Sequence, residues 1–275
     1  MDLTSVKTIK ELLSKYDAQP LKTMGQNFLV NKFVLDKIII ASDVGPKDIV
    51  LEIGPGIGTL TKELSKIAEK VIAVEKDKKM VEILKETLEN QKNVEVVQGD
   101  VLLTTNYQLP THYKVVANLP YYVTSPVIRK FLETKNPPDF MVLMVQKEVA
   151  QRICAKPPGM SLLAVSVQFY ANAEIISYVK KSSFWPSPKV DSAIIKITPF
   201  KKTRRRRASV GFFNIVKAGF SQPRKQLANN LSKGLGEHKE KVQAWLLKNN
   251  IEPSQRAETL SVENWISLTN DFSRK

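Results

Sequence analysis

Short hydrophobic runs and helical patterns alternate along the first two thirds of this chain. Residues 49–53 (Ile-Val-Leu-Glu-Ile) are typical of the runs, which predict strands because a strand buried on both faces reads as a continuous apolar stretch. Between the runs, apolar residues recur three or four positions apart, as on one face of a helix. The expected strands are 49–53, 70–74, 94–97, 114–117 and 140–145, and the expected helices are 59–66, 78–88, 125–132 and 148–155. This alternation predicts an α/β fold with a doubly wound, mainly parallel, Rossmann-like sheet.

The pattern changes on both sides of this region. Helical spacing precedes it, and a last helix with two closing strands, an antiparallel hairpin at the sheet edge, is expected after it. After Pro199 the patterns are helical, with no clear strand. These flanking segments are 4–16, 32–41, 162–179 and 190–197, followed by 212–219, 224–231, 237–249 and 262–272. We therefore expect a sheet domain over residues 1–198 and a small all-helical domain over residues 199–275.

The charge of the chain indicates a polyanionic partner. The chain carries 42 Lys+Arg against 27 Asp+Glu, a net charge of +15, and residues 199–275 carry 16 of the former against 6 of the latter. This excess favours nucleic acid over a membrane surface, because no basic amphipathic helix stands out. No apolar run approaches the ~18 residues of a membrane helix, and the first residues lack the features of a signal peptide.

Few residues of this chain can bind zinc or act as an imidazole base. A single cysteine, Cys154, excludes internal disulfides and fits a reducing cytoplasm. With His112 and His238 as the two histidines, neither a zinc site nor a histidine general base is well supported. We expect no metal and a cytoplasmic location.

A glycine-rich turn, Gly-Pro-Gly-Ile-Gly at residues 54–58, follows the first expected strand. Glycines let the chain turn sharply and let a ligand approach the backbone closely. The dinucleotide fingerprint places its third glycine three residues after the second, whereas here it follows after two. This spacing, with Glu52 upstream, suits the cationic ligand S-adenosylmethionine better than a pyrophosphate. Glu52, Gly54 and Gly56 are therefore candidate cofactor-binding residues.

Two further carboxylates end the next two expected strands. Glu75 can accept hydrogen bonds from both hydroxyls of a ribose, and Asp100, followed by Val101, can accept one from an adenine amino group. With Glu52, they place acids at three consecutive strand ends. Since the carboxyl ends of parallel strands share one edge of a sheet, we expect these residues to form one cofactor site.

The fourth expected strand ends at Asn118-Leu119-Pro120-Tyr121. The Asn118 side-chain oxygen and a main-chain carbonyl near Leu119 or Pro120 can accept hydrogen bonds from the exocyclic amine of adenine. This would turn the nitrogen lone pair toward a methyl donor without a strong base. Tyr121 can stack on the base and favour its transient positive charge. Phe184, in a loop stiffened by prolines, is the candidate partner on the other face of the base.

Seven segments of the chain together resemble the ribosomal RNA adenine dimethyltransferases. They occur in the family's order, and residues 253–260 resemble its closing helical region. The resemblance implies an S-adenosylmethionine-dependent methyltransferase sheet followed by a helical RNA-binding domain. It also implies transfer of four methyl groups to N6 of two adjacent adenosines in the 3′-terminal hairpin loop of small-subunit rRNA. The seven segments are 25–29, 52–60, 74–75, 99–100, 118–122, 146–148 and 184–192.

The resemblance also implies roles for single residues. Asn27 and Leu29 would close over the cofactor, Gly54 would lie under its methionine part, and Asn118 would lie between the cofactor and the target base. The chain departs from the family's pattern at Met24, where leucine is expected, and in the short stretch 157–161, which lacks an expected tyrosine. Basic candidates for contacts with the RNA backbone are Lys22, Arg204, Arg205, Arg206, Arg207, Arg224 and Lys225.

Three alternatives stay open beside this interpretation. Tyr122 and the segment 184–192 favour the small-subunit branch over the sister branch, which methylates large-subunit rRNA and confers macrolide resistance. An assembly factor that acts mainly by binding is the second alternative. A nicotinamide-dependent oxidoreductase is the third, and the glycine spacing argues against it. We expect the partner to be small-subunit rRNA within an immature small ribosomal subunit, and the protein to be a monomer.

Overall fold

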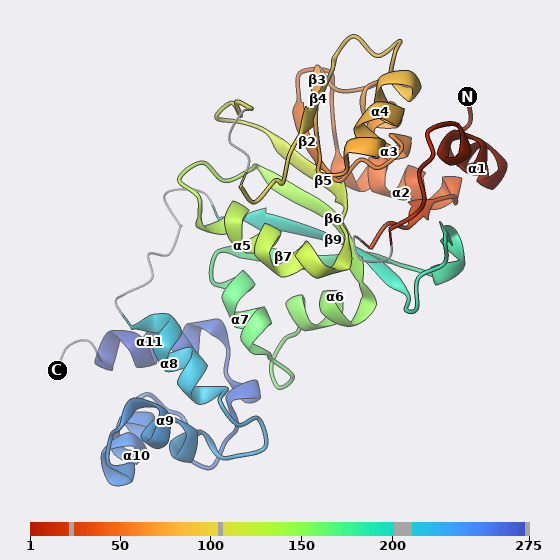
Figure 1. Cartoon of the computed structure of the whole chain (residues 1–275). Coiled ribbons are helices and arrows are strands. Elements are labelled where there is room, and N and C mark those ends of the chain that lie inside the picture. Colours follow the sequence, from red (N-terminus) through yellow and green to blue (C-terminus); the bar gives the residue numbers. More distant parts are fainter. Residues whose placement is uncertain (22–24, 104–106, 201–210, 273–275) are drawn as a thin grey trace. The chain divides into compact units, whose positions relative to one another are not determined.

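The computed structural model describes residues 1–21, 25–103, 107–200 and 211–272, and Figure 1 shows their arrangement. The strands are β1 Phe28–Leu29, β2 Ile49–Ile53, β3 Lys70–Glu75, β4 Val94–Gln98, β5 Lys114–Asn118, β6 Phe140–Gln146, β7 Ala171–Val179, β8 Phe184–Trp185 and β9 Ser192–Pro199. The helices are α1 Val6–Lys15, α2 Lys32–Ser42, α3 Thr59–Leu64, α4 Lys78–Thr87, α5 Thr124–Glu133, α6 Lys147–Ile153, α7 Leu162–Gln168, α8 Phe212–Gly219, α9 Leu227–Leu235, α10 Lys239–Lys248 and α11 Val262–Phe272.

In the part of the chain that the structure describes, seven strands form one sheet in the order β4-β3-β2-β5-β6-β9-β7. The strands from β4 to β6 pair in parallel, and β9 runs antiparallel to β6. The predicted α/β fold with a mainly parallel sheet is therefore confirmed. Each of the five strands expected in this region ends within one residue of the observed strand. Four of them, β2, β3, β5 and β6, are buried along most of their length, as their apolar runs predict, whereas β4 is a partly exposed edge strand.

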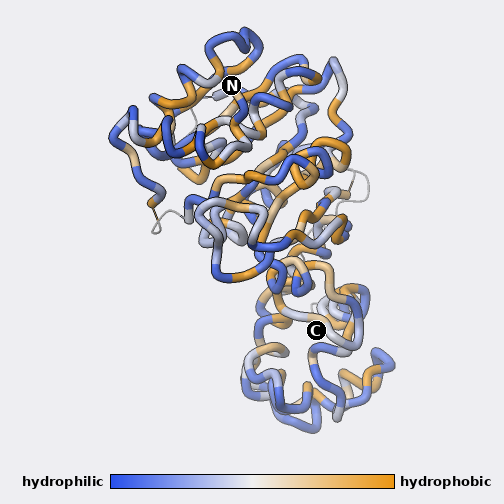
Figure 2. The backbone as a smooth tube through the Cα atoms, turned by 90° about the vertical axis from the view of Figure 1, so that its right-hand side faces the viewer, coloured by the Kyte–Doolittle hydropathy of each residue, from blue (hydrophilic) through white to orange (hydrophobic). Residues whose placement is uncertain are grey.

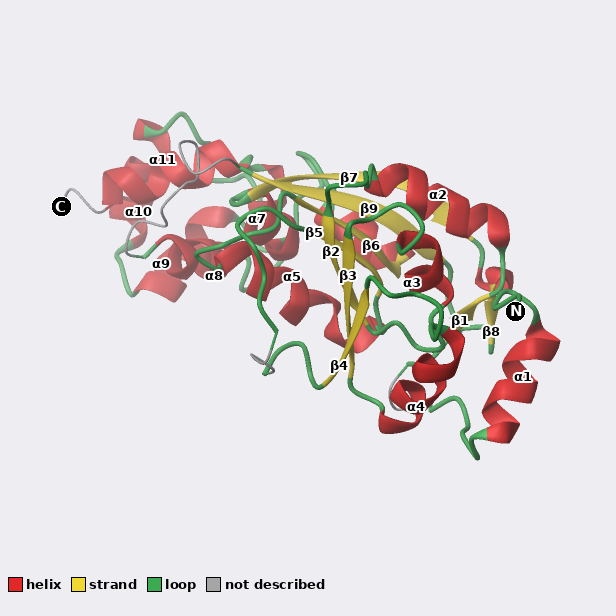
Figure 3. Cartoon of the chain, turned by 90° about the horizontal axis from the view of Figure 1, so that it is seen from above, coloured by secondary structure: helices red, strands yellow, loops and turns green. Residues whose placement is uncertain are grey.

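Helices cover both faces of the sheet. Val34 of α2 and Leu60 of α3 belong to the same buried cluster as Val116 of β5 and Val142 of β6, so these two helices pack on one face. Helix α5 lies on the other face (Figure 3). The tube in Figure 2 switches between hydrophobic and hydrophilic colours at short intervals, as amphipathic helices require.

Residues 28–29 and 184–185 form a two-stranded antiparallel ribbon that sequence reasoning missed. Phe28 pairs with Trp185 and Leu29 with Phe184, and the rings of Phe28 and Trp185 stack with centroids 6.5 Å apart. Two-residue strands are too short to show any alternation of polar and apolar positions, so only tertiary pairing reveals them. The ribbon brings Leu29 and Phe184 together.

The chain divides into two compact units, residues 1–150 with 174–199 and residues 151–173 with 200–275. Residues 151–173, expected in the sheet domain, thus belong to the helical unit. The reason is packing: Phe169, after α7, lies with its ring centroid 4.2 Å from that of Phe212 in α8, and both belong to one buried cluster.

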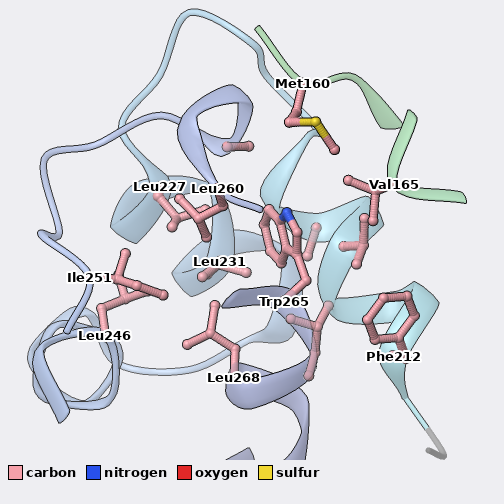
Figure 4. Packing of buried hydrophobic residues seen from close by; sticks show 14 of the residues in the cluster. Met160, Val165, Phe212, Leu227, Leu231, Leu246, Ile251, Leu260, Trp265 and Leu268 are labelled. Atoms are coloured by element: carbon pink, nitrogen blue, oxygen red, sulfur yellow. The ribbon is translucent and has the colours of Figure 1, made fainter. Parts of the chain in front are cut away.

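Trp265 of α11 is fully buried in the core of the second unit. Figure 4 shows its indole among apolar side chains, including those of Leu231, Leu268 and Val165. Within the described residues, no helix combines the length and the apolar character needed to cross a membrane.

Helix α9 begins later and ends later than the expected helix 224–231. The N–H groups of Leu227 and Ala228 donate to the carbonyls of Gln255 (2.7 Å) and Pro253 (3.3 Å), which lie outside the helix. These groups are then satisfied without a preceding helical turn, so the helix begins at Leu227.

Candidate active site

One pocket of the first unit is lined by every residue that the sequence placed in the cofactor and catalytic sites. It lies at the carboxyl ends of β2, β3 and β5 and is closed by the β1–β8 ribbon. The predicted residues that line it are Asn27, Leu29, Glu52, Gly54, Gly56, Glu75, Asp100, Val101, Asn118, Leu119, Pro120, Tyr121 and Phe184.

The glycine-rich turn forms the floor of this pocket. Gly54 and Gly56 have φ angles of +67° and +60°, a region that residues with a Cβ rarely adopt. A Cβ on Gly54 would lie 3.5 Å from Pro120 Cδ, and one on Gly56 would lie 3.3 Å from Phe28 Cε1. The two glycines therefore let the turn, the 118–121 segment and the ribbon approach one another closely.

Glu75 is held in one orientation by backbone donors. Its Oε2 accepts from the Gly56 N–H at 3.0 Å and its Oε1 accepts from the Asp77 N–H at 2.8 Å. Burial raises the pKa of Glu75, and these two N–H groups oppose the rise. The carboxylate lines the pocket and keeps capacity to accept from a hydroxyl group of a ligand.

Asp100 is tied to Lys76, a residue that sequence reasoning missed. Lys76 Nζ lies 3.0 Å from Asp100 Oδ2, and the Leu102 N–H donates to Oδ1 at 3.0 Å. The Leu102 N–H, with a smaller contribution from Lys76, lowers the pKa of Asp100. Lys130 donates to the Val101 carbonyl and so holds the next residue of the loop. The position of Lys76 directly after Glu75 was the signal that could have identified it.

Glu52 is a buried carboxyl group with little to stabilise its charge. It is 1% exposed, and its Oε2 has no hydrogen-bond partner in the part of the chain that the structure describes. Burial raises the pKa of Glu52 to about 8, the Thr61 hydroxyl opposes the rise and Glu75 adds to it. Because burial favours the neutral form of Glu52 and one of its oxygens lacks a hydrogen-bond partner among the described residues, a cation beside it would stabilise its ionised form. This part of the pocket therefore fits the positively charged methionine end of S-adenosylmethionine.

The side chain of Asn118 has a defined orientation. Its Nδ2 donates to the Asn27 carbonyl at 3.2 Å, and because a carbonyl only accepts, the amide nitrogen must be the atom that faces Asn27. Its Oδ1 makes no hydrogen bond among the described residues. The Leu119 N–H donates to the Met144 carbonyl at 3.2 Å and fixes the backbone beside it. The pocket thus holds one amide oxygen ready to accept a hydrogen bond from a ligand.

Two aromatic side chains complete the pocket. The Tyr121 hydroxyl lies 2.8 Å from Ser192 Oγ, which anchors the ring to β9, and burial raises its pKa. Phe184 is 4% exposed and lines the pocket from the β1–β8 ribbon. Ser192 is a second residue that sequence reasoning missed, since its contact with Tyr121 joins positions 71 residues apart.

Of the basic residues expected to contact RNA, Arg224 and Lys225 lie within the described residues. Lys22 and the run Arg204 to Arg207 fall outside the described residues. Arg224 and Lys225 are exposed residues of the second unit and lie in the turn before α9, not inside the helix expected there.

Comparison with known proteins gives the chain a family. The family model described as ribosomal RNA adenine dimethylase matches residues 19–273. A protein of Dehalococcoides mccartyi named ribosomal RNA small subunit methyltransferase A is 45% identical over 263 residues, covering 94% of this chain and 90% of that protein.

Two crystal structures are similar to the chain over 90% of its length. A dimethyladenosine transferase from Plasmodium falciparum has a TM-score of 0.77 at 29% identity, with 97% of it covered. The 23S rRNA methyltransferase ErmE has a TM-score of 0.73 at 25% identity, with 100% of it covered. The chain therefore belongs to the ribosomal RNA adenine dimethylase family and is an S-adenosylmethionine-dependent methyltransferase.

Proposed function

We propose that this enzyme transfers methyl groups to N6 of two adjacent adenosines in the 3′-terminal hairpin loop of small-subunit rRNA, giving dimethyladenosines. The observation that carries the proposal is the pocket itself. It joins the open Asn118 oxygen to three carboxyl groups suited to the amine, ribose and adenine of one cofactor. The relative named small subunit methyltransferase A supports the choice of rRNA.

The cofactor would be held along the sheet edge, from Glu52 to Asp100. Glu52 would face the cationic methionine end above Gly54, Glu75 would accept from the ribose hydroxyls, and Asp100 would accept from the adenine amino group. Gly56 and Val101 would line the same surface, and Asn27 and Leu29 would cover it. When bound, S-adenosylmethionine supplies an electrophilic methyl group on a sulfonium sulfur.

Asn118 would prepare the target amine for attack. The lone pair of adenine N6 is delocalised into the ring, so the amine is a poor nucleophile until its geometry changes. Acceptance of its hydrogens by Asn118 Oδ1 and by a carbonyl of Leu119 or Pro120 would favour a tetrahedral nitrogen. After transfer, the positively charged nitrogen is acidic and its proton can pass to water, so the site requires no strong base.

Tyr121 and Phe184 would hold the adenine ring between them. The hydrogen bond between the Tyr121 hydroxyl and Ser192 Oγ limits the motion of the tyrosine ring. An aromatic face also favours the transient positive charge on the base. The base must leave the RNA stack to reach this pocket, as in other enzymes that modify nucleobases.

RNA binding would use the basic residues outside the pocket. Arg224 and Lys225 are exposed and suit phosphate contacts, and Lys22, Arg204, Arg205, Arg206 and Arg207 are proposed for the same role. We further propose that the substrate is an immature small ribosomal subunit, that the enzyme acts as a monomer, and that it works in the cytoplasm.

A large-subunit target is the alternative with a specific observation behind it. The 23S rRNA methyltransferase ErmE shares the fold at 25% identity. The 45% identity to a small-subunit enzyme favours the small subunit.

One experiment tests the reaction and the target together. The enzyme is incubated with labelled S-adenosylmethionine and undermethylated small or large ribosomal subunits, and the modified nucleotides are identified by mass spectrometry. Dimethyladenosine in small-subunit RNA is the expected product. Labelling of large-subunit RNA alone would overturn the choice of target, and binding of subunits without labelling would leave only an assembly role.

A further inference from the structure

An exposed aromatic ring lies beside the catalytic pocket, with a lysine over it. Tyr178 of β7 is 53% exposed, and Ile176 on the same side of that strand is 41% exposed. Lys147, the first residue of α6, places its Nζ 5.3 Å from the centroid of the Tyr178 ring. Together these three residues form what we call the Lys147–Tyr178 surface, which no step of the proposed chemistry uses.

Backbone contacts connect this surface to the catalytic pocket. Gln146, which precedes Lys147, pairs with Ser192, the residue whose Oγ lies 2.8 Å from the Tyr121 hydroxyl. The Lys147 N–H donates to the Asp191 carbonyl at 3.0 Å. The surface therefore belongs to the same rigid sheet edge as the residue proposed to stack on the target base.

The charge around the surface is mainly positive. Lys180 and Lys181 follow β7 and are exposed, as is Lys189 in the next loop. Three carboxylates lie near them: Glu148, Asp191 and Glu174, which is exposed on the same side of β7 as Ile176 and Tyr178. Asp191 Oδ1 accepts from the Lys181 N–H at 3.0 Å, and the Ser187 hydroxyl donates to the Lys181 carbonyl at 3.0 Å. Hydrogen bonds within the 181–191 segment therefore hold this loop in place.

This combination selects nucleic acid over an apolar protein surface. A tyrosine ring offers a face to any base, and ammonium groups close to it attract the neighbouring phosphates. An apolar protein surface that covered Tyr178 and Ile176 would have to desolvate the ammonium groups of the neighbouring lysines, which costs stability.

We propose that Lys147 and Tyr178 form a stacking platform for a nucleotide of the rRNA next to the target adenosine, with Lys180 and Lys181 contacting its backbone. The base stacks on the Tyr178 ring, and the ammonium group of Lys147 pairs with a phosphate. The platform rests on the proposed function, since it needs an RNA whose target base occupies the pocket. It holds the RNA strand beside the adenosine that has left the stack.

The chain offers a matched control for this platform. Phe33 of α2 is 81% exposed, and among the described residues no lysine or arginine lies over its ring. Phe33→Ala thus removes an exposed ring of similar size without touching the proposed RNA contact.

The test measures methylation of undermethylated small ribosomal subunits by the full-length enzyme at low and high salt. Tyr178→Ala is expected to raise KM for the subunits about tenfold, whereas kcat and the Kd for S-adenosylmethionine stay unchanged. Tyr178→Phe keeps the ring and is expected to behave as wild type, as is Phe33→Ala. Lys147→Gln is expected to reduce the salt dependence of subunit binding by about one phosphate contact.

Several outcomes would overturn the platform. An unchanged KM for Tyr178→Ala, or an equal loss in Tyr178→Phe, would show that no base stacks on the ring. A weaker affinity of Tyr178→Ala for the cofactor would indicate a structural role instead. Loss of self-association with unchanged KM, seen by light scattering, would assign the surface to a second copy of the chain. Failure of the wild-type enzyme to methylate small subunits would instead overturn the proposed function.

Discussion

The pocket of the first unit and the core of the second unit are built from opposite kinds of side chain. The pocket holds the buried carboxyl groups of Glu52 and Glu75 and the half-buried amide of Asn118, and within the described part of the chain Glu52 Oε2 has no hydrogen-bond partner. The core of the second unit is a cluster of mainly apolar side chains around Trp265 (Figure 4), and its polar atoms without a partner among the described residues are two indole nitrogens, those of Trp245 and Trp265. Buried polar groups without partners cost stability, whereas buried apolar groups provide it.

This difference separates the residues proposed to bind ligands and catalyse the reaction from the residues that stabilise the fold. Substitutions in the pocket should change binding or rate and leave the fold intact, and substitutions in the helical core should do the reverse. Four substitutions test that separation.

Trp265→Ala should have the largest effect, and on stability alone. Removing a fully buried indole leaves a cavity, so we expect a loss of about 3–5 kcal/mol in the free energy of unfolding of the second unit. Denaturant unfolding followed by circular dichroism measures this loss. Cofactor binding by the folded fraction should match wild type. A weaker cofactor affinity would contradict the separate roles of the helical core and the pocket.

Asn118→Ala should have the largest effect on chemistry. Loss of the amide oxygen removes the group proposed to accept from the reacting amine, so we expect the rate of transfer at saturating substrate to fall roughly 10²-fold or more. Single-turnover transfer measures the rate, and calorimetry should find nearly wild-type affinity for S-adenosylmethionine. Near-normal turnover would contradict the role proposed for Asn118.

Glu52→Gln should change how stability depends on pH. Because burial raises the pKa of Glu52 to about 8, the folded chain keeps a proton that the unfolded chain has released above about pH 4.5. The folded state therefore loses stability as pH rises between these values, by up to about 1.4 kcal/mol per pH unit. Glutamine cannot ionise, so the variant should lose less stability than wild type between pH 6 and 8.

Thermal unfolding without cofactor at pH 6, 7 and 8 measures this difference. Glu95→Gln is the matched control, because Glu95 is a partly exposed carboxylate in an ion pair with Lys70. Parallel curves for wild type and Glu52→Gln would mean that Glu52 is ionised in the folded protein.

Lys76→Met should have the smallest effect. The lysine side chain is 53% exposed, so its ion pair with Asp100 contributes little, and a ligand that needs Asp100 must share or displace the ammonium. We expect S-adenosylmethionine to bind the variant no more than about fivefold tighter, with less dependence on salt. Titration calorimetry at two salt concentrations shows whether the affinity for S-adenosylmethionine rises or falls. Weaker binding would show that Lys76 positions Asp100 for the ligand.

Much of the pocket followed from the sequence because it depends on local pattern. The apolar runs predicted the strands to within a residue, and parallel strands bring their carboxyl ends to one edge. Glu75 and Asp100 could therefore be assigned to one site before any contact was known. Their roles toward a cofactor stay predictions until ligand binding is measured.

The errors arose where contacts between distant residues decide the outcome. Helix α7 has an ordinary amphipathic pattern, and only its packing near Phe212 places it in the helical unit. The first turn expected before α9 is replaced by hydrogen bonds to Pro253 and Gln255. The pairing of Lys76 with Asp100 joins residues 24 positions apart, which the pairing of β3 with β4 brings together.

The sequence by itself determined the α/β sheet, the glycine turn and the acidic residues at the strand ends, because short-range periodicity and strand-end position specify them. Only the tertiary structure decided which way the Asn118 amide faces, that Glu52 Oε2 has no hydrogen-bond partner among the described residues, and that Lys147 lies over Tyr178 beside the pocket. These properties depend on burial and on contacts across many residues, which a linear pattern does not contain.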